Sequence, residues 1–305
     1  LTATVLLLGT YAYAGFKEPE YLYPDKVETR FGTLKFDHGV PTEETSELLY
    51  DTLKYQRAIQ AYLWGLPLVG QCQWRQSYID QYNIKPNELV WCTKFNERAM
   101  ILTANESTPY MFGYANLKEA PLIMKIPAGG VIGLVIDFWE RGICDFGIFG
   151  PYAGKGGTYV FTGPTTPEEK TPYIEGARYI ESKTHNIWLL ARINAPDEKQ
   201  RDALAKKVLT GSDIDDVKSR MIDGQNKFGR NFHPRGIKYW EMLHQMINEE
   251  VVAERDRFFM YFLKDIGIEK GKPFNPSKAD KKILLEAGIV GEAMAKNFVF
   301  RERLP

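Results

Sequence analysis

The sequence lacks several features that would announce a class of function. Its 39 lysines and arginines balance 39 aspartates and glutamates, so the formal charge is zero. No basic field is therefore available to neutralise phosphates, and no nucleic-acid partner is expected. No apolar run approaches the length of about 20 residues that a bilayer span requires. The chain is thus expected to have no membrane span.

Cysteine and histidine are also scarce. Cys72, Cys92 and Cys144 are separated by 20 and 52 residues and form no C-x-x-C pair, which excludes a zinc knuckle and a redox dithiol. A disulfide between Cys72 and Cys92 is possible in an oxidising compartment, and the alternative is three thiols packed as small apolar groups. The four histidines fit no metal-binding motif, so no metal site is predicted. The sequence contains neither a nucleophile elbow nor a phosphate loop. No motif therefore identifies a cofactor, and the cofactor is unknown.

Aromatic residues, by contrast, are abundant. They make up 13% of the chain, with 17 Phe, 17 Tyr and 6 Trp. This composition favours β-strands and broad surfaces that can stack on apolar groups or sugars.

The amino end resembles a targeting segment. Residues 1–14 carry no charge, contain the apolar stretch from Val5 to Leu8 and finish on Ala12-Tyr13-Ala14, a small-x-small cleavage pattern. This pattern predicts the remnant of a secretory signal and a secreted or periplasmic location. The alternative is a buried N-terminal strand or helix.

The rest of the chain predicts an α+β fold. A mainly antiparallel β-sandwich core is expected, with an N-terminal helix and a C-terminal helical segment. The N-terminal helix covers residues 42–64 and is expected to end at Gly65-Leu66-Pro67. Short apolar runs predict strands at 89–92, 121–126, 131–138, 158–161 and 187–193, and helical spacing predicts helices at 197–208, 213–221, 238–263 and 277–297.

Two polar clusters are candidates for chemistry. Asp137, Glu140 and Arg141 follow an apolar strand, and two carboxylates in one cleft could divide acid and base roles while the arginine steadies negative charge. The arginine could equally pair with them structurally. The second cluster is the polar run at residues 101–110, and its short polar groups could contact a ligand or only satisfy their own turns. Together with two tryptophans and a lysine from a glycine-rich turn, this run supplies the candidate ligand-binding residues, which are Trp64, Asn105, Glu106, Thr108, Tyr110, Trp139 and Lys155.

Several stretches together resemble a known family. They are Arg30-Phe31-Gly32-Thr33-Leu34, Gln56-Arg57-Ala58, residues 60–67, Thr103-Ala104-Asn105, Thr108-Pro109-Tyr110, Lys155-Gly156-Gly157, Glu254-Arg255-Asp256-Arg257 and residues 267–274. The set is similar to bacterial secreted or envelope proteins that join domains of unknown function 1254 and 1214. The resemblance implies a β-sandwich-type domain over 15–195 and a helical segment over 196–305, leading to a second β domain that is missing here. Many relatives carry an acidic residue where this chain has Ser107.

Three functions are consistent with these observations. The first is a secreted protein that binds a small molecule or saccharide in an aromatic-lined cleft. The second is a hydrolase or lyase on an extracellular polymer, which requires Asp137, Glu140 and Asn105 to converge. The third is a structural envelope protein that forms a homo-oligomer through its C-terminal helices, which exposed Phe and Tyr on those helices would favour.

Overall fold

A computed structural model describes residues 23–93, 107–224 and 232–301. The chain divides into two compact units, Leu1–Gln56 and Arg57–Pro305. In the first, β1 (Lys26–Thr29), β2 (Gly32–Asp37) and β3 (Val40–Pro41) form a small antiparallel sheet. Helix α2 (Glu43–Tyr82) begins in this unit and continues into the second.

Helix α2 is longer than the sequence predicts, because it does not end at Gly65-Leu66-Pro67. Pro67 lies inside it, although proline in a helix interior removes a hydrogen bond and costs about 3 kcal/mol. The following turns carry Leu68, Val69 and Tyr78, all fully buried. Burial of each such side chain stabilises by about 1.5–3 kcal/mol, so tertiary packing outweighs the local signal that predicted the helix end.

The second unit contains the predicted sandwich. A six-stranded sheet has the order β13-β4-β5-β11-β7-β8 and a four-stranded sheet the order β10-β9-β6-β12. The pairs are antiparallel except for β9–β10 and β4–β13. The strands are β4 (Leu89–Cys92), β5 (Tyr110–Asn116), β6 (Leu122–Ile126), β7 (Val131–Asp137), β8 (Gly142–Gly147), β9 (Gly157–Thr162), β10 (Arg178–Glu181), β11 (Asn186–Ile193), β12 (Leu209–Gly211) and β13 (Met221–Asp223).

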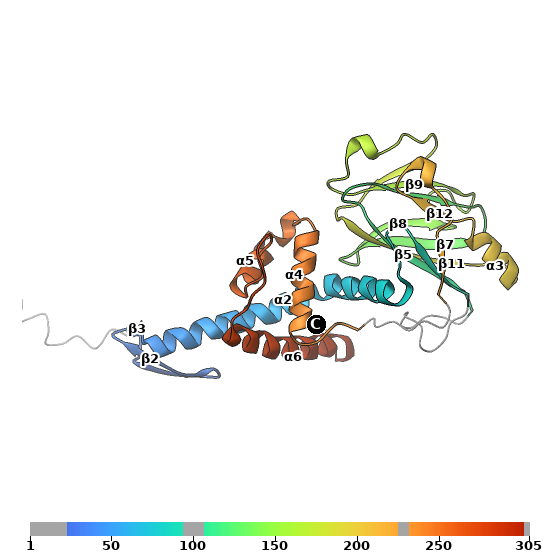
Figure 1. Cartoon of the computed structure of the whole chain (residues 1–305). Coiled ribbons are helices and arrows are strands. Elements are labelled where there is room, and N and C mark those ends of the chain that lie inside the picture. The colour runs from blue at the N-terminus through green and yellow to red at the C-terminus, as the bar shows by residue number, and fades with distance from the viewer. Residues whose placement is uncertain (1–22, 94–106, 225–231, 302–305) are drawn as a thin grey trace, which may run out of the picture. The chain divides into compact units, whose positions relative to one another are not determined.

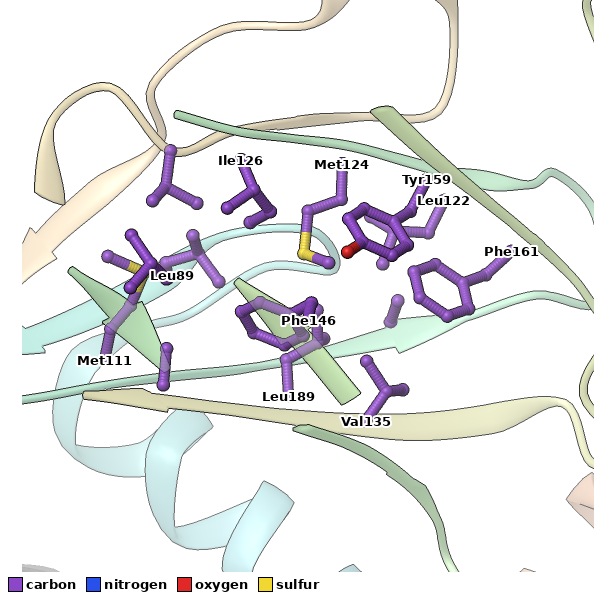
Figure 2. Packing of buried hydrophobic residues seen from close by; sticks show 14 of the residues in the cluster. Leu89, Met111, Leu122, Met124, Ile126, Val135, Phe146, Tyr159, Phe161 and Leu189 are labelled. Atoms are coloured by element: carbon purple, nitrogen blue, oxygen red, sulfur yellow. The ribbon is translucent and has the colours of Figure 1, made fainter. Parts of the chain in front are cut away.

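The core lies between the two sheets, as Figure 2 shows. Met124 and Tyr159 of the smaller sheet pack with Val135, Phe146 and Leu189 of the larger one. On β11 the buried core residues alternate along the strand, as a strand with one face in a sandwich requires. The expected α+β fold with an antiparallel sandwich is confirmed.

The opposite face of the larger sheet is covered by the C-terminal half of α2 (Figure 1). Tyr78 stacks on Phe112 of β5 with ring centroids 4.5 Å apart, and Trp74 meets Trp188 of β11 edge-on at 5.2 Å. Aromatic pairs of this kind contribute about 0.5–1.5 kcal/mol beyond their burial. Strands β4 and β5 of the larger sheet are therefore buried on both faces.

The C-terminal part is helical but departs from the prediction in two places. The expected helix at 213–221 is wrong: a 3₁₀ turn at Ile214–Asp216 leads into strand β13. The expected helix at 238–263 is divided in two by the extended Glu250. The helices are α3 (Glu198–Ala205), α4 (Ile237–Glu249), α5 (Arg257–Asp265) and α6 (Lys278–Phe300), and further 3₁₀ turns lie at Glu168–Lys170 and Glu254–Asp256.

All three cysteines are free. Cys72 and Cys92 are buried and Cys144 is half-buried. The possible disulfide between Cys72 and Cys92 is not formed. Burial raises the pKa of the Cys72 thiol to about 11, so this thiol is protonated at neutral pH and packs as a small apolar group.

Candidate functional site

The predicted acid-base cluster forms the turn between β7 and β8. The carboxylate of Asp137 is buried and accepts from the backbone N–H of Trp139 at 2.8 Å and of Arg141 at 3.0 Å. Its other oxygen accepts from Nε of Arg141 at 2.7 Å. Glu140 is exposed, has a φ of 59°, and accepts from the side-chain amide of Gln71 at 3.2 Å. Asp137 thus organises the backbone and the arginine of its own turn.

The two predicted tryptophans meet beside this turn. Trp64 of α2 lies 4.7 Å from Trp139, centroid to centroid, and stacks on Phe259 of α5 at 4.9 Å. The indole N–H of Trp64 points to Asp256 at 3.4 Å. The hollow between these residues measures only about 10 Å³, which is about enough for one water molecule. The hollow between Trp64 and Trp139 therefore has no room for a sugar ring.

The other predicted ligand-binding residues lie at the opposite end of the larger sheet. Tyr110 pairs with Arg192, which pairs with Ile132 near the start of β7, whereas Asp137 ends that strand. Tyr110 is thus five strand residues away from the level of Asp137, which corresponds to about 17 Å along the sheet.

Lys155 and Thr108 also belong to that far end. Lys155 is exposed in the loop before β9, where the neighbouring Gly154 hydrogen-bonds to Gly129 just before β7. Thr108 is half-buried two residues before β5. Asn105 and Glu106 lie outside the described residues.

A buried polar cluster lies on the α2 side of the sheet, at the end that carries Asp137. Arg75 of α2 binds both carboxylate oxygens of Glu249 in α4, at 2.8 and 3.0 Å. The same guanidinium donates to the side-chain oxygen of Asn186 at 2.8 Å and lies over the ring of Phe138, 5.3 Å from its centroid. This bidentate geometry fixes one orientation of the arginine.

Two further groups tie this cluster to the strands. Asn116 of β5 donates to the side-chain oxygen of Asn186 at 2.9 Å. The carboxylate of Glu250 is buried and accepts from the backbone N–H of His185 at 2.7 Å and of Asn186 at 2.9 Å. The Asn186 amide adds a third bond to Glu250 at 2.7 Å. These bonds hold the end of α4 against the first residue of β11.

The electrostatics of the pair favour its charged form. Burial opposes ionisation of Glu249, but hydrogen bonding and the charge of Arg75 outweigh it and lower the pKa of Glu249. Glu249 is therefore ionised at neutral pH and paired with a cation that is itself largely buried.

A cavity of about 320 Å³ opens beside this pair, and we call it the Arg75 cavity. Its volume is within the range of small-molecule sites. Most of its walls are apolar, and the polar part comes from the Arg75–Glu249 pair, two asparagines, Lys85 and the hydroxyl of Tyr114. The lining residues are Arg75, Ile79, Ile84, Lys85, Pro86, Tyr114, Ala115, Asn116, Asn186 and Glu249.

Two larger hollows, of about 670 and 700 Å³, are both lined by Phe232, His233 and Arg235. Across the described segments, no three His, Cys, Asp or Glu side chains are placed to hold a metal ion. No described helix is long and apolar enough to cross a membrane.

The sequence prediction missed the Arg75 cavity because its residues come from distant segments. Arg75 and Glu249 are 174 positions apart, and Asn116 and Asn186 are 70 apart. One local signal was available: Arg75 is a charge within a stretch of α2 whose neighbours Cys72 and Tyr78 are buried. Because the predicted helix ended at Gly65-Leu66-Pro67, Arg75 was not recognised as part of a buried helix.

Comparisons with known proteins agree with the fold and name no function. Residues 86–215 match the model of the family described as "Protein of unknown function (DUF1254)", which confirms that part of the resemblance. The VPA0106 protein from Vibrio parahaemolyticus has a similar crystal structure, with a TM-score of 0.56 and 14% identity over 80% of this chain. The present chain spans 59% of the length of that structure. No curated protein matches the sequence.

Proposed function

We propose that the protein binds a small molecule in the Arg75 cavity. The observation that carries this proposal is the combination of a hollow of about 320 Å³ with a fixed, partly buried ion pair at its wall. Binding sites for small molecules are concave and mostly apolar, with a few polar groups that fix the ligand's orientation. The Arg75–Glu249 pair is held by Asn186 before any ligand arrives, so little ordering is needed on binding.

The geometry supports binding better than acid-base catalysis by Asp137 and Glu140. The oxygens of Asp137 are engaged by the backbone and side chain of its own turn. Glu140 is exposed and hydrogen-bonded to Gln71. The aromatic groups proposed to stack on a saccharide, Trp64 and Trp139, pack against each other in a tilted arrangement, and Trp64 stacks on Phe259. A hydrolase or lyase that uses this cluster would need the turn to rearrange.

The test is a thermal-shift screen of small amphiphilic compounds on wild type and on Ile79→Trp. Ile79 lines the cavity and its side chain is 39% exposed, so a larger ring can enter the hollow without disturbing the core. A compound at ten times its Kd should raise the melting temperature of wild type by about 2 °C or more. The variant should lose that shift.

Leu53→Trp is the matched control, because Leu53 lies on the same helix, is 40% exposed and does not line the cavity. It should respond as wild type does. Equal shifts in wild type and Ile79→Trp would place binding elsewhere and overturn the proposal, as would a library that shifts neither protein.

A second candidate function is self-association through the C-terminal helices. Phe258 and Tyr261 of α5 are 65% and 71% exposed, and Phe298 of α6 is 62% exposed. Large apolar side chains in such numbers favour a surface that another protein covers. Light scattering on wild type and on the double variant Phe258→Ser/Tyr261→Ser tests this, and a wild type that remains monomeric at high concentration would exclude it.

We further propose that the protein is exported and that a second domain follows the helical segment. The uncharged residues 1–14 and their small-x-small ending support export. The resemblance supports a following domain 1214. Fractionation of cells that express the natural gene would test export, because an exported protein should leave the cytosolic fraction and lose its first residues.

A further inference from the structure

We infer that the ligand of the Arg75 cavity is a small amphiphile with one anionic headgroup, which Lys85 binds. The inference rests on the proposed function and specifies its ligand. It follows from the charges around the cavity, from the hydrogen bonds already made there, and from the size of the hollow.

The polar groups of the cavity wall are mostly engaged with one another. Arg75 gives hydrogen bonds to Glu249 and Asn186, and Asn116 gives one to Asn186. The amide of Asn186 donates in turn to Glu250 at 2.7 Å. A ligand that needed many hydrogen bonds would have to break these, whereas an apolar body would leave them intact.

The remaining wall suits an apolar body. Ile79 belongs to α2, Ile84 and Pro86 follow that helix, and Ala115 belongs to β5. Placing apolar surface against them removes it from water, which stabilises the complex by about 25 cal/mol per Å².

Lys85 carries the one charge of the cavity lining that is not balanced by another lining residue. Arg75 and Glu249 cancel each other, so the lining carries a net charge of +1 from Lys85. Its backbone N–H donates to the carboxylate of Glu88 at 2.7 Å. Its ammonium group has no hydrogen bond or ion pair with any described residue, and the side chain is exposed. An anionic headgroup at the rim would meet this ammonium while the body lies inside.

The size of the hollow limits the body. A volume of about 320 Å³ corresponds to roughly ten water molecules at about 30 Å³ each. An eight-carbon carboxylate has about that many non-hydrogen atoms, so octanoate is a suitable probe, and octanamide and octan-1-ol are its neutral counterparts.

Isothermal titration calorimetry on the full chain tests the inference with these three probes. Octanoate should bind wild type about fivefold more tightly than octanamide or octan-1-ol, since an exposed ion pair contributes up to about 1 kcal/mol. Lys85→Met should remove this preference and leave the affinity for octanamide unchanged. Lys199→Met, which alters an exposed lysine of α3 outside the cavity, should keep it.

The possible failures are distinguishable. If octanoate and octanamide bind wild type equally, and Ile79→Trp abolishes both, the headgroup inference is wrong while the cavity remains a binding site. A preference for octanoate that survives in Lys85→Met would also overturn the assignment to Lys85. If no probe binds wild type, the inference fails, and the library screen on Ile79→Trp decides the proposed function separately.

Discussion

Removal of the Arg75 guanidinium should destabilise the protein through the charge that it leaves behind. In Arg75→Met the carboxylate of Glu249 loses both of its bonds to the arginine, and the side-chain oxygen of Asn186 loses one donor. Breaking a buried ion pair on one side costs about 3–5 kcal/mol. Since the Glu249 side chain is 30% exposed, water can solvate part of it, and we expect about 3 kcal/mol.

Urea denaturation followed by circular dichroism measures this loss as a change in the free energy of unfolding. The double variant Arg75→Met/Glu249→Leu should recover much of it, because no unpaired buried charge remains. Lys183→Met is the matched control: its partner Glu181 and its own side chain are both mostly exposed, so its cost should stay below about 1 kcal/mol.

The same pair makes a prediction about pH. The pKa of Glu249 is lowered in the folded state, so the pair's contribution is fully present above the unfolded pKa of about 4.3 and is lost as pH falls through the folded value. Arg75→Met should therefore lose less stability than wild type on acidification. A cost under about 1 kcal/mol at pH 7, with unchanged pH dependence, would show that the pair is a solvated surface contact and refute the reasoning.

Two further predictions concern packing and a surface ion pair. In Gly133→Ala the new Cβ would overlap the ring of Phe146, so urea denaturation should show a loss of about 1–3 kcal/mol in the free energy of unfolding. Gly142→Ala on the neighbouring strand, with open space around it, should be neutral or slightly stabilising, and equal effects of the two substitutions would contradict this packing. The hydrogen bonds of Glu292 to Arg235 and Lys296 lower its pKa to about 2. Its contribution to the free energy of unfolding, about 1 kcal/mol or less, is therefore present above pH 4.5 and declines toward pH 2. If the stability of Glu292→Gln changes with pH in parallel with that of wild type throughout an acid titration, this prediction is wrong.

The fold class could be predicted because its signals are local. Short apolar runs bounded by Gly and Pro mark strands such as β6 and β7, and the short loops between such runs favour antiparallel sheets. Helix boundaries that are set by tertiary contacts could not be predicted in this way. Pro67 is a strong local signal for a helix end, and it failed because the turns after it are buried, with Tyr78 stacked on Phe112 of the sheet.

The candidate site could be predicted only in part. The sequence left two roles open for the acids after β7, acid-base chemistry or a structural pairing with Arg141. Asp137 makes that pairing, but whether it faces a ligand or its own backbone depends on a conformation that sequence does not specify. Arg75 and Glu249 form their pair only when α2 packs along the sheet and α4 ends beside β11. Such long-range pairing leaves no periodic trace in a single sequence.

A crystal structure of the protein with the tightest-binding compound of the screen would show whether the Arg75 cavity is the binding site. We expect electron density for the compound against Ile79 and Ile84, with the Arg75–Glu249 pair intact and any anionic group near Lys85. Density in the hollows beside His233, with the Arg75 cavity empty, would contradict it.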